Sequence, residues 1–445
     1  MSKPLHDDFG AQARPAQKHF QVLVLGAGVM GQRHIASLIE IADKVLAPQG
    51  ITLDIAAVDR RDDMLKVLPA RVTPFADMDS ALAAQKPDIA VMAFNDDQHI
   101  SAFRKLFAER PDLQAVLTEK PLTEHLREAR ELEPELRKRY LSMNTVVNFS
   151  PVFDRLTEMM PSIDAAHGGL KPIGFEAIWG KNRTADTRPS IGVPSESVHA
   201  LSIISDMFGH ARLSLEQGAA KKGYLSEKAA DVIYEIDSTF RSGKTGTPVL
   251  FHASYVFDSQ HRKVTAYYGA GNGDALAVEL DFDVKHNGQN ADRLRIHRID
   301  RASGAIETLV DEHPSEIVNG AAPGLLRADR ITAFNSLSMI DFLTPPQKRA
   351  PALAARLSNL DAALEVQAEV EQINPQNRLL RVSEMDADPK ALGKPKYGSI
   401  TEAGADAVLA RLAALESLQK PAPPHALHGS HRAAKKGLVE ISRLF

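Results

Sequence analysis

The sequence predicts an α/β protein of two domains. The first is built on a doubly wound parallel sheet, and the second is an α+β domain with a large, mostly antiparallel open sheet. Up to residue 150, short apolar runs alternate with longer stretches that repeat apolar residues at helical spacing, as in βαβ units. The first of these runs ends in glycines. Beyond residue 151, longer runs of alternating character follow one another through glycine- and asparagine-containing turns, which is typical of antiparallel strands.

Length and composition agree with this fold and exclude several classes of protein. The 445 residues allow two or three domains, and 44% hydrophobic with 25% charged residues is ordinary for a globular protein. The formal net charge of −4 argues against a nucleic-acid or membrane-surface partner. Cysteine is absent, which excludes disulfides, thiolate nucleophiles and Cys-ligated metals. Residues 1–19 form a polar arm without a secretory core, and no run is long enough to span a membrane, so we expect a cytoplasmic protein.

Residues 20–150 are expected to form the first domain. Its strands are nearly all apolar, which indicates burial on both faces of the sheet. The expected strands are Gln21–Gly28, Ile51–Asp59, Ile89–Phe94, Ala115–Lys120 and Thr145–Phe149. The expected helices include Val29–Leu46, His99–Glu109 and Leu122–Tyr140.

Residues 151–373 are expected to form the second domain, for substrate binding and oligomerisation. Its strands are expected at Phe175–Trp179, Asp231–Phe240, Val249–Phe257, Lys263–Gly269, Leu276–Val284 and Arg293–Ile299. Its helices are expected at Ser195–Gly209, Arg327–Leu343 and Ala352–Ile373, and we expect the last of these to return to the first domain. Residues 374–445 are a C-terminal extension, with an amphipathic helix at Thr401–Leu418 and then a flexible tail.

The strongest local signal is the glycine turn Gly26-Ala27-Gly28-Val29-Met30-Gly31, between the first strand and the first helix. Gly26 allows a tight turn, Gly28 lets a pyrophosphate approach the main chain, and Gly31 lets the helix pack closely. The N–H groups at the helix start then face the phosphates. The pattern predicts a Rossmann dinucleotide site, with a glycine turn used only for packing as the alternative.

Two features at the end of the second strand bear on the choice of cofactor. Asp59 stands where a carboxylate holds the ribose 2′-OH, which favours NAD. Arg60 and Arg61 follow at once, and a guanidinium there can accommodate a 2′-phosphate. We therefore expect NAD, with NADP as the alternative and a solvated arginine pair as the purely structural reading.

Glu119-Lys120-Pro121 ends another strand of the parallel sheet. Ligands bind outside the carboxyl ends of such strands, so Lys120 is a candidate acid/base for an alcohol–ketone interconversion. Taken alone, this residue is better explained as an ordinary lysine at a strand end.

The order of GAGVMGQRH, AAVD, IAVMAFNDDQH, LTEKPL and VVNFS resembles the glucose–fructose oxidoreductase, inositol dehydrogenase and rhizopine-catabolism family (Gfo/Idh/MocA), from Gln21 to Gln372. The resemblance implies an NAD(P)-dependent dehydrogenase or reductase acting on CH–OH groups of a sugar, cyclitol or similar polyol. It implies that Lys120 is the catalytic acid/base, with Glu119 beside the cofactor. It also implies that Phe94, Asn95 and His99 cover the ribose and nicotinamide, although Phe94-Asn95-Asp96 replaces the family's threonine-proline-asparagine.

The resemblance also implies that His199 is catalytic, on the helix that opens the second domain. The family places an aspartate four residues before this histidine, where this chain has Ser195. Glu196 stands one residue later, a rotation of about 100° on a helix, so it does not simply replace that aspartate. Asn182 and Arg183 are further candidates for lining the substrate site, together with Glu196, and an ordinary loop is the alternative for Asn182 and Arg183.

Several expectations remain open at this point. An open antiparallel sheet often pairs with a copy of itself, so we expect a homodimer or homotetramer. Two other functions stay open: glycoside cleavage with retained NAD, and a non-catalytic dinucleotide-binding sensor or scaffold. No metal site is expected, because the neighbours of His425, His428 and His431 are prolines and lysines, without an acid or cysteine to complete a ligand set. Trp179 is expected within a strand of the second sheet.

Overall fold

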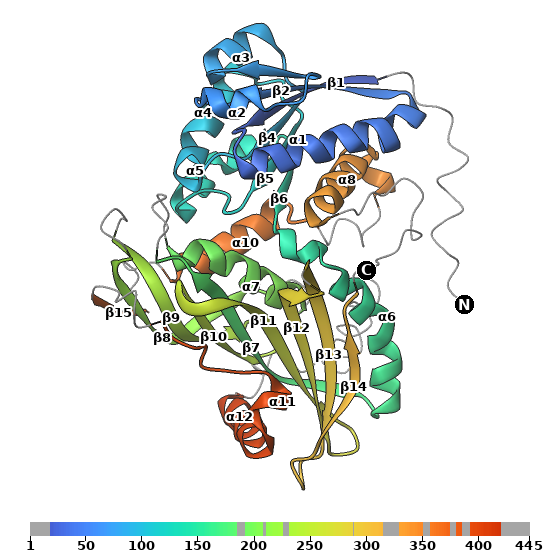
Figure 1. The fold of residues 1–445 in the computed structure, drawn as a ribbon, viewed down its shortest axis with the longest axis vertical. Coiled ribbons are helices and arrows are strands. Elements are labelled where there is room, and N and C mark those ends of the chain that lie inside the picture. The colour runs from blue at the N-terminus through green and yellow to red at the C-terminus, as the bar shows by residue number, and fades with distance from the viewer. Residues whose placement is uncertain are drawn as a thin grey trace. The chain divides into compact units, whose positions relative to one another are not determined.

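The computed structural model describes residues 18–184, 192–207, 211–225, 231–287, 289–314, 329–349, 357–373, 380–384 and 392–419 (Figure 1). The first 17 residues of the polar arm and the whole tail with His425, His428 and His431 lie outside the described residues. The chain divides into two compact units, Met1–Phe149 with Glu316–Leu364 and Ser150–Ser315 with Glu365–Phe445. No helix in the described part of the chain has the length and apolar character needed to cross a membrane.

The first unit contains a parallel sheet of six strands in the order β3-β2-β1-β4-β5-β6, which confirms the predicted doubly wound fold. The strand order reverses between β1 and β4, and ligands of such folds bind outside the carboxyl ends of the strands at this reversal. The strands are β1 (Lys18–Leu25), β2 (Ile51–Val58), β3 (Val72–Phe75), β4 (Ile89–Met92), β5 (Ala115–Glu119) and β6 (Tyr140–Asn144).

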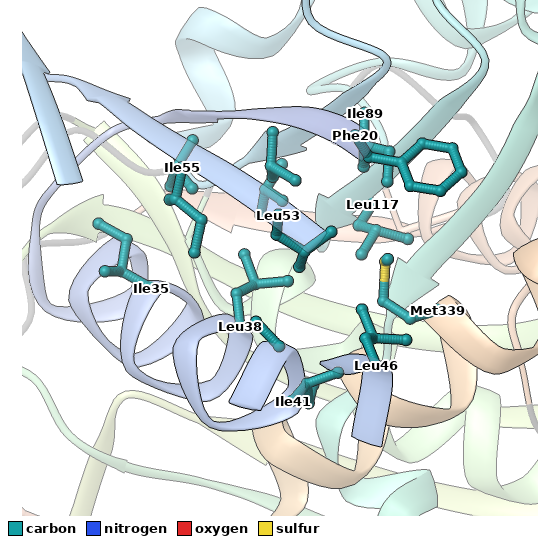
Figure 2. Close-up of a cluster of buried hydrophobic side chains, with 14 of the residues drawn as sticks. Phe20, Ile35, Leu38, Ile41, Leu46, Leu53, Ile55, Ile89, Leu117 and Met339 are labelled. Carbon is teal, nitrogen blue, oxygen red and sulfur yellow. The ribbon is translucent and has the colours of Figure 1, made fainter. Parts of the chain in front are cut away.

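Helices cover both faces of this sheet. Figure 2 shows Ile35, Leu38 and Ile41 of α1 packed against the strands, with Met339 of α8 beside them. Leu23 alternates to the opposite face and is also fully buried, as expected for strands covered on both sides. Each such aliphatic side chain contributes about 1.5–3 kcal/mol to stability when buried. The helices of the unit are α1 (Val29–Ile41), α2 (Asp62–Lys66), α3 (Met78–Ala84), α4 (His99–Glu109), α5 (Leu126–Leu136) and α8 (Arg330–Leu343).

The last strand of this sheet lies earlier in the chain than the sequence analysis expected. Residues Tyr140–Asn144 form β6, and Val146–Phe149 form a 3-10 turn, so the strand expected at Thr145–Phe149 is wrong. The chain must turn here because Ser150 caps the next helix: its side chain accepts a hydrogen bond from the Val152 N–H. The sequence analysis also missed β3, a strand of only four residues.

Helix α8 belongs to the first unit, although the sequence analysis had placed residues 330–343 in the second domain. Its side chains Phe334, Leu337 and Met339 are at most 5% exposed and are part of the core around α1. The chain therefore returns to the first unit to complete its hydrophobic core.

The second unit contains a sheet of nine strands in the order β14-β13-β12-β11-β7-β10-β9-β8-β15. The pairs β7–β10 and β8–β15 are parallel and the remaining pairs antiparallel, which confirms a mostly antiparallel sheet. The single strand expected at Val249–Phe257 is two strands that meet at Tyr255. The strands are β7 (Leu170–Asn182), β8 (Leu213–Tyr224), β9 (Asp231–Ser242), β10 (Pro248–Ser254), β11 (Val256–Ala270), β12 (Ala275–His286), β13 (Gln289–Ile299), β14 (Ile306–Glu312) and β15 (Arg381–Glu384).

Among the described residues, the helices α6 (Pro151–Ala166) and α7 (Val193–Met207) pack on one face of this sheet. The ring of Phe282 lies 5.8 Å from that of Trp179 and 6.0 Å from that of Phe153 on α6. Trp179 is a fully buried strand residue, as expected. The sequence analysis missed α6, which carries a proline inside the helix.

The opposite face of the same sheet is partly covered by residues 393–419, called here the C-terminal cover. It contains α11 (Ile400–Ala403) and α12 (Ala405–Leu418), drawn in red on the opposite side of the sheet from α7 (Figure 1). The apolar side of α12 packs on β7, β11, β12 and β13, and Leu412 and Leu415 are at most 2% exposed. Helix α10 (Leu360–Glu371) precedes β15 and spans the division between the two units.

Polar contacts fix the C-terminal cover as well. The Ile400 N–H donates to the Glu279 carboxylate at 3.0 Å, and Arg411 lies 3.7 Å from Glu176. The sequence analysis expected this face to be open for pairing with a second copy. Self-association stays a prediction, but the surface on which it rested is occupied by the chain itself.

Candidate active site

The glycine turn lies between β1 and α1, as the sequence analysis expected. Gly26 has φ +102°, and a Cβ there would lie 2.7 Å from the Ala93 carbonyl oxygen. A Cβ on Gly31 would lie 1.8 Å from the Gly26 oxygen, so the helix packs against the turn with no room for a side chain. Gly28 caps α1 with backbone alone. The N–H groups of the first turn, which have no intrahelical partner, are then available to an anion.

The surface beside this turn is unusual for its apolar exposure. Val29, the first residue of α1, is 77% exposed, and Met30 after it is half-buried. The Val29 side chain therefore lies outside the hydrophobic core. The residues therefore fit a dinucleotide diphosphate at the helix start.

Asp59 ends β2 next to the glycine turn. One carboxylate oxygen accepts the Ala27 N–H at 3.0 Å, and the other accepts the Arg61 N–H at 3.0 Å. The Arg61 guanidinium lies 3.2 Å from the same carboxylate and is 57% exposed, and Arg60 is exposed. Burial acts to raise the pKa of Asp59, but the hydrogen bonds from Arg61 and Ala27 and the Arg61 charge outweigh it, so this pKa lies below its usual value. The carboxylate is therefore ionised and paired.

The loop after β4 carries Phe94, which is half-buried, and Asn95, which is exposed. His99 begins α4 and is only 1% exposed. Its Nε2 lies 3.2 Å from the Phe94 carbonyl oxygen, and its Nδ1 lies 3.0 Å from the Pro121 oxygen. The direct cofactor contact expected of His99 remains untested, and in the structure its ring joins two backbone loops.

Glu119 and Lys120 stand at the carboxyl end of β5, and both are partly buried. Glu119 accepts hydrogen bonds from His34 at 2.8 Å and from Asn144 at 2.7 Å. The carboxyl ends of β1, β2, β4 and β5 lie along one edge of the parallel sheet. The sheet topology therefore brings the glycine turn, Asp59, the Phe94 loop and Lys120 to one edge.

In the second unit, His199 lies on α7 with its ring 5.9 Å from that of Trp179, and it is 6% exposed. Ser195 is one helical turn earlier and 7% exposed. Glu196 is instead part of an ion cluster, 2.6 Å from Arg183 and 3.4 Å from Arg262. The Glu196 carboxylate is thus paired with two arginines.

Asn182 and Arg183 differ in their surroundings. The Asn182 side chain is exposed and accepts hydrogen bonds from Thr184, while the Arg183 guanidinium lies 4.9 Å above the Tyr255 ring. Sequence analysis missed Arg262, His34 and Asn144 in these groups. The histidine of GAGVMGQRH offered a signal, since it follows the glycine turn at helical spacing, but nothing local pointed to Asn144 or Arg262.

Comparison with known proteins agrees with the fold. Residues 20–144 match the family model described as "Oxidoreductase family, NAD-binding Rossmann fold", that of Gfo/Idh/MocA. No curated protein matches the sequence significantly. The 3-ketoreductase KijD10 from Actinomadura kijaniata, solved with NADP and TDP-benzene, has a TM-score of 0.57 at 14% identity, over 82% of this chain and 99% of its own.

A second solved structure is UDP-N-acetylglucosamine 3-dehydrogenase GnnA from Acidithiobacillus ferrooxidans. Its TM-score is 0.53 at 18% identity, over 81% of this chain and 98% of its own. At these identities the two structures show a shared fold, and the family match is carried by the first unit. The first unit of the chain therefore carries a domain that matches the NAD-binding Rossmann fold of the Gfo/Idh/MocA oxidoreductases.

Proposed function

We propose that the protein interconverts a hydroxyl and a carbonyl group on a sugar, cyclitol or similar polyhydroxylated small molecule, with Lys120 as acid/base. The observation that carries this proposal is the position of Lys120 at the end of β5, on the sheet edge that holds the glycine turn and Asp59. The described activities of the two similar structures support the substrate class, since one is a 3-ketoreductase and the other acts on a nucleotide-linked sugar.

The residues of the first unit fit the cofactor. The backbone of the glycine turn would hold the pyrophosphate, and Asp59 with an arginine would hold the ribose of the adenosine half. The loop after β4 and the Glu119-Lys120 pair would border the nicotinamide half. When bound, the nicotinamide supplies the acceptor or donor of the hydride. The proposed cofactor residues are Gly26, Gly28, Val29, Met30, Gly31, Asp59, Arg60, Phe94, Asn95, His99, Glu119 and Lys120.

Lys120 handles the proton that accompanies this transfer. In the oxidising direction its neutral ε-amine accepts the hydroxyl proton as the substrate carbon loses its hydride, and a carbonyl forms. In the reducing direction the ammonium returns the proton to the carbonyl oxygen. A positioned general acid/base contributes about 10²–10⁴-fold to such a reaction.

Four residues of the second unit are proposed for the substrate side. His199 is the second candidate for proton transfer, and its ring lies beside that of Trp179. Arg183 and Asn182 carry donors and acceptors suited to hydroxyl groups, and Glu196 holds the Arg183 guanidinium in place.

A turnover assay with lysine variants tests the proposal. A panel of free sugars, cyclitols and nucleotide-linked sugars is screened with NAD(H) and NADP(H), following the absorbance of the reduced nicotinamide. Lys120→Met removes the amine at similar side-chain length, and we expect a loss of about 10²–10⁴-fold in kcat. Lys120→Arg keeps a cation that does not act as a base at neutral pH, so it should also be inactive. Lys138→Ala, at an exposed lysine after α5, is the matched control.

The other outcomes are informative. Full turnover in Lys120→Met refutes the assigned role. Product release without a net change in nicotinamide absorbance indicates glycoside cleavage with retained NAD. Saturable NAD(H) binding without turnover on any compound of the panel indicates a non-catalytic sensor or scaffold.

A further inference from the structure

We propose that His34 is a positioning residue for Lys120, acting through Glu119. The inference rests on the proposed role of Lys120 and adds a residue from α1. His34 is fully buried, and its two hydrogen-bond partners come from two other elements of the first unit, Glu119 from β5 and Asn335 from α8.

The Glu119 carboxylate is held from two sides. Its Oε1 accepts from His34 Nε2 at 2.8 Å and from Asn144 Nδ2 at 2.7 Å. Its side chain is 12% exposed, so little water competes for these hydrogen bonds. Burial acts to raise the pKa of Glu119, but the hydrogen bond and charge of His34, then Asn144 and the Lys120 charge, lower it below its usual value. The carboxylate beside Lys120 is therefore ionised and fixed in direction.

The other nitrogen of His34 is also used. Nδ1 lies 3.1 Å from the Asn335 amide oxygen, and the Asn335 amide nitrogen donates to Ser37 Oγ at 3.1 Å. Because the amide nitrogen is engaged by Ser37, the oxygen faces the ring, and a carboxylate stands at Nε2. Both ring nitrogens are therefore engaged, and the ring cannot rotate without losing a bond. His34 and Asn335 are 301 residues apart in sequence, so α8 contributes directly to this arrangement.

The backbone that follows Lys120 is contacted by a second histidine, His99. His99 Nδ1 lies 3.0 Å from the Pro121 oxygen and 3.2 Å from the Leu122 oxygen, and its ring is buried. Lys120 thus lies between a side chain held by His34 and a backbone held by His99. An acid/base must be held within a fraction of an ångström of its working geometry, and these two anchors restrict the segment on both sides.

If His34 and Glu119 served only to stabilise the fold, substitutions of His34 would have different effects. If His34 only stabilises the fold, its loss lowers thermal stability and cofactor binding together, and any substitution of similar size has the same effect. If it positions Lys120, a side chain that keeps only the donor at the Nε2 place restores function. Glutamine carries such a donor and leucine does not, while both lack the ring.

The experiment compares His34→Leu with His34→Gln in the full chain, with His19→Leu as an exposed control on β1. The first readout needs no substrate. Acetic anhydride is applied at a mildly alkaline pH, and acetylation of Lys120 is measured by mass spectrometry against the other lysines. We expect Lys120 to react about threefold faster or more in His34→Leu than in His34→Gln, because the Glu119 carboxylate, whose charge interacts with that of Lys120, is then no longer fixed in place.

The second readout is turnover on whichever compound the panel identifies. We expect kcat to fall about tenfold in His34→Leu, with KM and the cofactor Kd within about threefold, and most of kcat to return in His34→Gln. Equal acetylation and equal kcat in the two variants overturn the proposal. If His34→Leu does not fold, as judged by circular dichroism, Asn335→Ala leaves the ring in place without its acceptor. It should change Lys120 acetylation in the same direction, and no change there also overturns the proposal.

Failure of this inference is separable from failure of the proposed function. A protein without turnover on the panel can still show the difference in Lys120 acetylation. Conversely, an active protein whose two His34 variants behave alike keeps Lys120 as acid/base and loses only the positioning role of His34.

Discussion

Replacing Arg61 with alanine should weaken NADP(H) binding and leave NAD(H) binding nearly unchanged. The Arg61 guanidinium lies 3.2 Å from Asp59, and a Cβ built on Gly28 would lie 3.2 Å from the same side chain. It therefore stands between the acidic residue and the glycine turn, where a 2′-phosphate would be placed. Its removal deletes a cation and also leaves the Asp59 carboxylate without its charged partner, and both changes disfavour a phosphate.

The magnitude follows from the exposure of the pair. A hydrogen bond between charged groups is worth about 1.5–3 kcal/mol when shielded from water. The Arg61 side chain is 57% exposed, so screening reduces its contribution. We therefore take about 1–1.5 kcal/mol, which corresponds to about a tenfold rise in the Kd of NADP(H). The Kd of NAD(H) should stay within about threefold, since Asp59 still accepts a ribose hydroxyl.

Titration of both cofactors, followed by nicotinamide fluorescence or calorimetry, gives the ratio of the two Kd values. Arg60→Ala is the natural comparison, because Arg60 is exposed and the pair with Asp59 is made by Arg61. We expect a smaller change in the ratio there. If Arg61→Ala leaves the ratio of the two Kd values as in the parent protein, Arg61 does not read the 2′-position and the reasoning fails.

Three further predictions concern the turn and the second sheet. Gly31→Ala should abolish cofactor binding and destabilise the fold, because its Cβ would lie 1.8 Å from the Gly26 oxygen, and retained NAD(H) binding by titration would contradict this. Burial acts to raise the pKa of Glu279, but the hydrogen bonds and cations around it hold that pKa at about 2. Glu279 should thus contribute about 3 kcal/mol at neutral pH, lost as the pH falls from about 4.5 toward 2, and urea unfolding of Glu279→Gln should show a weaker pH dependence than the parent. Gly174→Ala should undock α12, because its Cβ would lie 2.6 Å from Leu415, and adding Leu415→Ala should restore part of the lost stability, so strictly additive effects in thermal unfolding would count against this packing.

Much of the first unit could be predicted because its signals are local. The glycine turn, the strand ending at Glu119 and the helix at His99–Glu109 each carry their pattern within a few residues. The strand expected at Thr145–Phe149 failed for a physical reason. Its apolar residues form a buried 3-10 turn that leads to Ser150, the N-cap of α6. A short buried apolar run of this kind has the same sequence pattern as a buried strand.

The remaining features depend on contacts between distant residues. The partner of His34 is Asn335, and no pattern within α8 marks that asparagine as a ligand of the ring. Arg262 joins the cluster around Glu196 through strand register, which becomes visible only once β11 pairs with β7. The placement of α8 in the first unit follows from core packing. The sequence of a mostly apolar helix does not indicate which of two hydrophobic cores it joins.

The C-terminal cover has a consequence for how this protein can assemble and be handled. With α12 seated across β7 and β11, a neighbouring molecule meets helix surface where it would otherwise meet strands, so any pairing of copies has to use other surfaces. A chain truncated before residue 393 would expose the apolar residues that α12 covers, together with the carboxylates of Glu176 and Glu279. Such an exposed apolar surface favours aggregation over the formation of defined dimers. The segment from 393 to 419 is therefore an integral wall of the second unit, and shortening the protein for expression should stop after it.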